Sequence, residues 1–164
     1  MSASRLARLI RRTGRVAEPA PPPPLQPEEP TIDQRLAGSA QVRHVDCGSC
    51  NGCEIEVGAA FGPVYDADRY GARLVASPRH ADVLLVTGVV TRNMEAPLLR
   101  TVEATPRPRV VIAVGDCAVD GGLLREGYGV VGPVGQVVEV DLVVPGCPPE
   151  PEAIVAALRR VTRR

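Results

Sequence analysis

The sequence predicts an α/β fold, in which a mostly parallel sheet carries helices on both of its faces. Short runs of apolar, β-branched residues alternate with segments of helical periodicity, a pattern that favours right-handed crossovers between parallel strands. Aromatic residues make up only 2% of the 164 residues and Trp is absent. The core therefore has to be built from Val, Leu, Ile and Ala, as is typical of a buried parallel sheet.

The first 30 residues are expected to lie outside this domain. Residues 3–16 would place three aliphatic side chains on one face of a short basic helix, which could bind an anionic membrane surface or remain a solvated terminus. Residues 17–30 contain four consecutive prolines and predict an extended tether. We expect a single domain over residues 31–164, a length that can bury a hydrophobic core.

Within this domain, the strands and helices are predicted in alternation. Apolar runs predict strands over 41–45, 72–76, 82–87, 109–114 and 137–144. Helical patterns predict a brief helix over 31–36 capped by Thr31, and longer helices over 53–62, 95–104 and 151–160. The last helix has proline in its first turn, where the missing N–H is not needed. In such a sheet, the binding site lies beyond the carboxyl ends of the strands.

Composition narrows the compartment and the class of chemistry. No apolar run is long enough to span a bilayer, and the Arg-rich start lacks the apolar core of a secretory signal. We therefore expect a cytoplasmic protein, in which clustered cysteines more often bind metal or do redox chemistry than form disulfides. No glycine-rich phosphate-binding loop follows a predicted strand, which argues against nucleotide binding. We also expect no nucleic-acid partner.

The five cysteines are the candidate functional residues. Cys47, Cys50 and Cys53 directly follow the first predicted strand, whereas Cys117 and Cys147 each follow a later one. Because parallel strands end at a common edge, four or five thiols are expected to meet there. The alternative for the two remote cysteines is a role as small apolar core residues.

Four thiolates can hold either tetrahedral zinc or an iron-sulfur cluster. A four-cysteine zinc site usually has two close cysteine pairs, and this chain has one close group. A bacterial ferredoxin run would need a cysteine at position 57, which is Val. Two cysteines separated by two residues, with two remote ones, suit a cluster with several iron atoms.

Small residues around the cysteines support a cluster, because backbone amides can approach sulfur only where no side chain intervenes. Glu54 falls in the first turn of a predicted helix, where the helix dipole favours a carboxylate. The residues expected around the cluster are Gly52, Glu54, Gly115, Gly121, Gly122, Gly146 and Pro148.

With these residues assembled, the sequence resembles the small iron-sulfur subunit shared by nickel-iron hydrogenases and respiratory complex I. The resemblance runs from about Val42 to Ala157. Its motifs are Cys-Asn-Gly-Cys-Glu-Ile-Glu at 50–56, Ser-Pro-Arg-His-Ala-Asp followed by an apolar run at 77–88, Gly-Asp-Cys-Ala at 115–118 with the glycine pair at 121–122, and Val-Pro-Gly-Cys-Pro-Pro at 144–149.

The resemblance implies a flavodoxin-like, doubly wound domain that carries one 4Fe-4S cluster. The implied ligands are Cys50, Cys53, Cys117 and Cys147. The surplus Cys47 could substitute for Cys50, lie beside the cluster as an unligated thiol, or be a bystander, and the last two are favoured because Cys50 and Cys53 fit the resemblance. The implied partners are a large catalytic subunit, a ferredoxin-like iron-sulfur subunit and membrane subunits. The chain would then pass electrons at the cytoplasmic face of the cell membrane, as a peripheral subunit that performs no catalysis alone.

The spacing of the first two ligands distinguishes the branches of this family. The complex I branch has two adjacent cysteines at the first ligand position, whereas Cys50 and Cys53 are separated by two residues. This resembles the membrane-bound hydrogenases of the formate-hydrogenlyase type. The alternatives are the quinone-proximal subunit of a complex I-like enzyme and a zinc-stabilised scaffold without a redox role.

Overall fold

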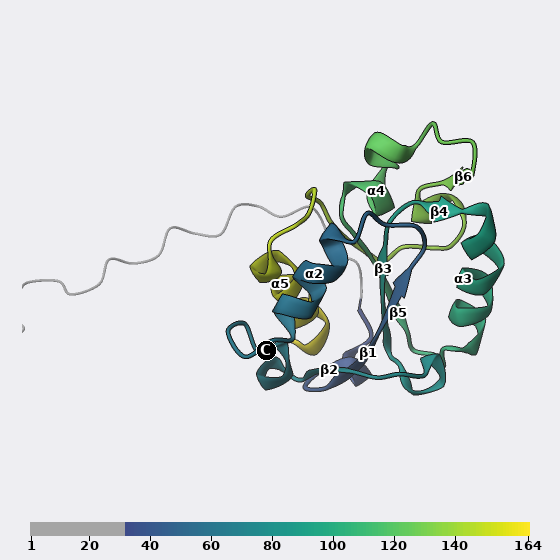
Figure 1. The fold of residues 1–164 in the computed structure, drawn as a ribbon. Coiled ribbons are helices and arrows are strands. Elements are labelled where there is room, and N and C mark those ends of the chain that lie inside the picture. The colour runs from purple at the N-terminus through teal and green to yellow at the C-terminus, as the bar shows by residue number, and fades with distance from the viewer. Residues whose placement is uncertain (1–31) are drawn as a thin grey trace, which may run out of the picture.

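The computed structural model describes residues 32–164, which form a central sheet flanked by helices (Figure 1). The five strands pair only in parallel and lie in the spatial order β2-β1-β3-β5-β7. The chain passes from β1 outward to β2 and then returns to β3 on the other side of β1. Counted in chain order, this is the flavodoxin-like arrangement, which confirms the predicted fold class. The strands are β1 (Ala40–Asp46), β2 (Ala72–Leu74), β3 (Val83–Thr87), β5 (Val110–Val114) and β7 (Leu142–Val144).

Helices cover both faces of the sheet. On one face, α2 (Gly52–Ala60) and α5 (Pro151–Thr162) pack together, and α3 (Arg92–Ala104) covers the other face (Figure 1). Alternate side chains of the central strands serve the two layers: Leu85 joins the core under α2 and α5, while Leu84 joins the core under α3. Every residue of β3 and β5 is buried, which explains why all of them except Thr87 are aliphatic.

Two aspartates fix the strand register at the amino edge of the sheet. The N–H of Asp82 donates to the carbonyl of Gln41 at 2.8 Å, and the Asp82 carboxylate accepts the N–H of Gln41 at 2.8 Å. Asp141 does the same with Val111, at 2.9 Å and 2.7 Å. Each aspartate therefore extends the strand pairing by one residue. The backbone N–H and the carbonyl of Gln41, and likewise those of Val111, are both hydrogen-bonded.

The structure differs from the sequence prediction near both ends of the domain. The last strand was expected over 137–144 but is confined to β7, because the preceding valines pack against the α3 layer as a loop after the 3₁₀ helix η5 (Val134–Gln136). The first short helix is the 3₁₀ helix η1 (Gln34–Leu36), capped by the carboxylate of Asp33. Thr31, the expected cap, lies outside the described residues, as do the basic segment and the proline-rich tether.

Several small elements were not predicted. They are an antiparallel pair of short strands, β4 (Val90–Thr91) with β6 (Val130–Gly132), the one-turn helix α4 (Asp116–Val119), and the 3₁₀ helices η2 (Ala67–Tyr70), η3 (Pro78–His80) and η4 (Gly122–Leu124). Each is too short for a hydrophobic period to develop. In the part of the chain from residue 32 onward, none of the helices has the length and apolar character needed to cross a membrane.

Two adjacent leucines on α3 provide a test of this packing. Leu98 is fully buried and Leu99 is 46% exposed. We expect Leu98→Ala to lower the free energy of unfolding by about 2–5 kcal/mol, because it leaves a cavity in the core. Leu99→Ala should change it by only about 0.5 kcal/mol. Urea denaturation of the two variants measures both values, and equal losses would contradict the packing of α3 through Leu98.

Candidate metal centre

The cysteines lie on loops that follow the carboxyl ends of three strands. Cys50 and Cys53 come after β1, Cys117 after β5 and Cys147 after β7. Together the four line one cavity of about 70 Å³. Cys53 is buried and Cys117 is half-buried, whereas Cys50 and Cys147 are exposed. The structure thus brings together the four thiols that the sequence grouped, in a site that is closed on the inside and open on the outside.

Glycine is required where the backbone approaches two of these sulfurs. Gly115 has φ +89°, and a Cβ atom there would lie 2.5 Å from Sγ of Cys53. Gly122 has φ +47°, and its Cβ would lie 3.1 Å from Sγ of Cys117. Both positions have a positive φ that favours glycine. A side chain has no room at Gly115 unless Cys53 shifts, and at Gly122 it would make a tight contact with Cys117.

The other residues expected around the cysteines divide into two groups. Gly52, Gly146 and Pro148 line the cavity. Gly121 does not face a sulfur, since a Cβ there would meet the side chain of Arg125 at 2.6 Å. Glu54 is also absent from the cavity lining.

Glu54 lies in the first turn of α2 beside a histidine of β1. Its Oε1 is 3.8 Å from Nδ1 of His44, and Nε2 of His44 is 2.9 Å from Oγ1 of Thr87. Burial lowers the pKa of His44, although the charge of Glu54 acts in the opposite direction. His44 of β1 thus contacts Glu54 of α2 on one side and Thr87 of β3 on the other, and neither His44 nor Glu54 lines the cavity of the thiols.

Cys47 is separate from the other four cysteines. It is fully buried in the core under α3 and is not among the residues that line the cavity. Its N–H donates to the carbonyl of Thr87 at 3.0 Å, and its carbonyl accepts both the N–H and the hydroxyl of Thr91 at 3.0 Å. Burial, with a contribution from Asp46, raises the pKa of the Cys47 thiol to about 12. This thiol therefore stays protonated at neutral pH, as expected of a core residue.

The thiols that line the cavity influence one another electrostatically. Burial raises the pKa of Cys53 to about 11, and the neighbouring Cys117, Cys50 and Cys147 add to the increase. Burial, followed by Cys147 and Cys50, likewise raises the pKa of Cys117. Four thiolates cannot share this space without a positive charge between them, and a bound metal group supplies such a charge by displacing the protons.

Two aspartates that sequence reasoning did not single out hold the cysteine loops. Oδ1 of Asp46 accepts the N–H groups of Gly48 at 2.9 Å and Ser49 at 2.8 Å. Oδ1 of Asp116 accepts the N–H of Gly146 at 2.7 Å. Each aspartate directly precedes a cysteine in the sequence, and this repeated Asp-Cys pair was a signal that could have revealed them.

The donor set fits a group that binds through four soft ligands. Thiolates are the preferred ligands of both zinc and iron-sulfur clusters, and glycine backbone leaves the space between these sulfurs free of side chains. Across residues 32–164, no three His, Cys, Asp or Glu side chains are arranged to hold a single metal ion.

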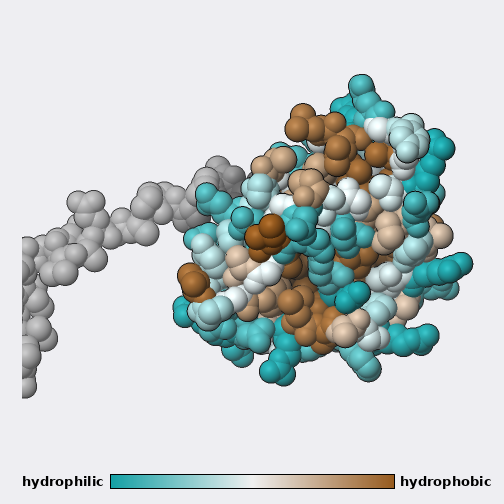
Figure 2. Space-filling model, viewed as in Figure 1, coloured by the Kyte–Doolittle hydropathy of each residue, from teal (hydrophilic) through white to brown (hydrophobic). Residues whose placement is uncertain are grey.

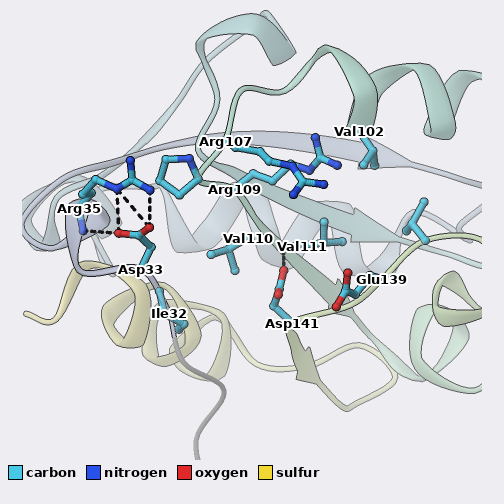
Figure 3. Close-up of a pocket in the computed structure, with 12 residues that line it drawn as sticks. Ile32, Asp33, Arg35, Val102, Arg107, Arg109, Val110, Val111, Glu139 and Asp141 are labelled. Atoms are coloured by element: carbon cyan, nitrogen blue, oxygen red, sulfur yellow. Dashed lines mark hydrogen bonds and ion pairs between the residues drawn. The ribbon is translucent and has the colours of Figure 1, made fainter.

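A larger cavity, of about 510 Å³, lies at the opposite edge of the sheet, at the amino ends of β5 and β7 (Figure 3). Charged side chains of both signs line it, but two of its carboxylates are already engaged. Asp33 pairs with Arg35 at 2.7 Å, and Asp141 accepts the N–H of Val111 (Figure 3). No cysteine is among its described lining residues, so the candidate chemistry belongs to the smaller cavity.

Known proteins match this chain closely. Formate hydrogenlyase subunit 7 of Escherichia coli is 48% identical over 138 residues, which cover 77% of this chain and 54% of that protein. The probable membrane-bound hydrogenase subunit mbhJ of Pyrococcus furiosus is 50% identical over 135 residues, covering 78% of this chain and 81% of the relative. An NADH-quinone oxidoreductase subunit of Carboxydothermus hydrogenoformans is 42% identical over 113 residues, covering 68% of each chain.

Structural similarity agrees with these relatives. A chain of the archaeal membrane-bound sulfane sulfur reductase superposes with a TM-score of 0.68 and 29% identity, covering 79% of this chain and 71% of that one. The relatives are subunits of oxidoreductase complexes of the hydrogenase and NADH-quinone oxidoreductase types. The model of the family described as NADH ubiquinone oxidoreductase, 20 Kd subunit, matches residues 50–161. The chain belongs to this family, as its cysteine motifs suggested.

Proposed function

We propose that this chain is an electron-transfer subunit in which Cys50, Cys53, Cys117 and Cys147 hold one 4Fe-4S cluster. The observation that carries the proposal is the convergence of these four thiols, from loops after three different strands, on one cavity. A 4Fe-4S cluster accepts and releases single electrons at a potential set by its ligands, nearby charge and solvent exposure.

The residues around the thiols have supporting roles in this proposal. Gly115 and Gly122 let the backbone approach Cys53 and Cys117, and Pro148 covers the cavity beside Gly52. In this proposal the close approach of the backbone would limit the access of water to the inner side of the site, and exclusion of water helps to set the potential. The described residues that line this cavity include no other assembled catalytic group, so the chain would carry electrons for a reaction that takes place in a partner.

The hydrogenase branch is the better supported of the two redox alternatives. Cys50 and Cys53 are separated by two residues, and the hydrogenase relatives are 48% and 50% identical, against 42% for the quinone oxidoreductase relative. In the alternative, this chain is the quinone-proximal subunit of a complex I-like enzyme. The sequence of the accompanying large subunit decides between them, since a nickel-iron site needs two pairs of spaced cysteines there.

The exposed side of the cysteine site, where Cys50 and Cys147 lie, suggests where a partner would bind. Leu123 is 94% exposed and Tyr128 is 97% exposed, on the segment between α4 and β6 that follows Cys117. Figure 2 shows apolar side chains gathered over this part of the molecule. We propose that a large catalytic subunit covers this surface and the exposed Cys50 and Cys147, and that ferredoxin-like and membrane subunits complete a complex at the cytoplasmic face of the membrane.

Single cysteine substitutions test the proposed ligands. Anaerobically purified protein should contain one 4Fe-4S cluster per chain and give an electron paramagnetic resonance signal after reduction. We expect Cys117→Ala to lose most of its iron, because it removes a ligand, and Cys47→Ala to retain it, because Cys47 lies outside the cavity. A colourless wild-type protein with one zinc per chain would support the scaffold alternative and contradict the proposal. Iron loss in the Cys47 variant alone would contradict the ligand set.

A glycine substitution tests the tight approach to Cys53. Gly115→Ala adds a methyl group 2.5 Å from Sγ of Cys53 and forces a strained φ, so we expect markedly reduced iron per chain. Gly58→Ala is the control, because Gly58 lies within α2 and has nothing within 4 Å of its Cβ position. It should retain the iron and raise the free energy of unfolding by about 0.5–1 kcal/mol. Equal iron in both variants would contradict the close packing at Gly115.

A charge on the exposed apolar segment tests the proposed partner. We expect Leu123→Glu to abolish co-purification of the large subunit from the native host, because it puts a charge into an interface that excludes water. Val64→Glu is the control. Val64 is 82% exposed but follows the carboxyl end of α2, whereas Cys53 lies in the first turn of that helix. Leu123, by contrast, directly follows Gly122, which approaches Sγ of Cys117. If the Leu123 variant keeps its iron and still retains the large subunit, the partner must bind elsewhere.

A further inference from the structure

Strand pairing between β5 and β7 continues past the ends of both strands and reaches the cysteines. The N–H of Gly115 donates to the carbonyl of Val144 at 2.8 Å, and the N–H of Asp116 donates to the carbonyl of Gly146 at 2.9 Å. Oδ1 of Asp116 then accepts the N–H of Gly146 at 2.7 Å. Asp116 and Gly146 are thus joined by two hydrogen bonds, one from each backbone N–H.

This pair of bonds lies directly beside two of the proposed ligands. Asp116 precedes Cys117 and Gly146 precedes Cys147, and all four residues line the cavity. Fixing the two preceding residues to each other limits how far the two thiols can separate. The carboxylate has no competing cation, since neither ion pair found within residues 32–164 involves Asp116.

The same arrangement occurs at the opposite edge of the sheet, where no cysteine is near. Asp82 pairs with Gln41, and Asp141 pairs with Val111, each through one backbone bond and one carboxylate bond of 2.7 to 2.9 Å. These two pairs register strands at their amino ends. Asp116 makes the same pair of hydrogen bonds at the carboxyl ends of β5 and β7, where it fixes the loops of Cys117 and Cys147 relative to each other.

We infer that Asp116 is a positioning residue, which sets the separation of Cys117 and Cys147 through a charge-assisted hydrogen bond to the Gly146 N–H. The inference rests on the proposed function, because its effect is exerted on a cluster held by these thiols. Hydrogen bonds to an ionised acceptor are shorter and stronger than neutral ones, and groups that orient ligands in this way influence both metal retention and potential. A negative charge at the edge of the cavity also disfavours the added electron of the reduced state.

The test compares full-length variants that are purified anaerobically. Iron release to a ferrous chelator, the electron paramagnetic resonance spectrum and the midpoint potential are measured for each. We expect Asp116→Ala to release iron roughly 10- to 100-fold faster than wild type and to give an altered spectrum. Asp116→Asn keeps an acceptor oxygen but loses the charge, so it should retain the iron and show a midpoint potential above that of wild type.

Asp82→Ala and Asp141→Ala are the matched controls, because they remove the corresponding carboxylate bond at the amino edge. They should lower the free energy of unfolding and leave the spectrum, the midpoint potential and iron release unchanged. Effects on these three readouts as large as those of Asp116→Ala would show a general loss of stability and overturn the inference, as would a wild-type spectrum and release rate in Asp116→Ala.

If Asp116→Ala does not fold, Asp116→Asn decides the question. A spectrum and midpoint potential equal to those of wild type would then contradict the inference, and an altered spectrum with a raised potential would support it. A wild-type chain without any cluster would contradict the proposed function and the inference with it. A normal wild-type cluster that is insensitive to both Asp116 substitutions contradicts the inference alone.

Discussion

The parallel pairing of β1, β3, β5 and β7 is the constraint on which the rest of the molecule depends. Because these strands run in one direction, every loop that follows their carboxyl ends emerges at a single edge. The cysteine loops after β1, β5 and β7 are distant in sequence, yet their thiols meet at one cavity. Reversing any of these strands would carry its cysteine to the far edge of the sheet. The topology of the sheet therefore brings the thiols to one edge, and side-chain packing only sets their detailed positions.

The same pairing requires a core that covers both faces of the sheet. β3 and β5 are buried along their whole length. All of their residues except Thr87 are aliphatic, and such side chains fill the space on both faces without the bulk of aromatic rings. The layer of α2 and α5 holds the loop of Cys50 and Cys53 from one side, and the α3 layer supports Cys47 and α4 from the other. The inner thiol Cys53 is consequently buried, whereas Cys50 and Cys147 on the outer side are exposed.

Much of this arrangement could be predicted from the sequence, because it depends on patterns that extend over many residues. The alternation of apolar runs and helical segments predicted the sheet and its three long helices, and each cysteine could be assigned to the end of a run. What the sequence did not predict depends on single contacts. Val137, Val138 and Val140 have strand-forming side chains, yet they pack as a loop on the α3 layer, because β7 can pair with β5 only from Leu142 onward.

Within the site, the position of a residue in the sequence did not by itself determine which way that residue faces. Gly121 and Gly122 are adjacent, but only Gly122 approaches a sulfur. Cys47 and Cys50 lie three positions apart, but the turn at Gly48, with φ +134°, sends one into the core and the other to the cavity. The carboxylates of Asp46 and Asp116 accept hydrogen bonds from the backbone N–H groups of Gly48 and Gly146. Such directions are set by tertiary contacts, which no periodicity encodes.

The four thiols differ in exposure, so the site has a buried inner side and an exposed outer side. Cys53 and Cys117 are the inner pair, held by glycine backbone and with raised pKa values, whereas Cys50 and Cys147 face outward. A metal group bound by all four would be shielded from water on the side of the sheet and accessible on the other. The exposed apolar segment after Cys117 begins next to Gly122, which approaches Sγ of that cysteine. In the proposed complex, a partner that covers the exposed Cys50 and Cys147 would also exclude water from the outer side of the metal group, so electron transfer and assembly would use the same surface.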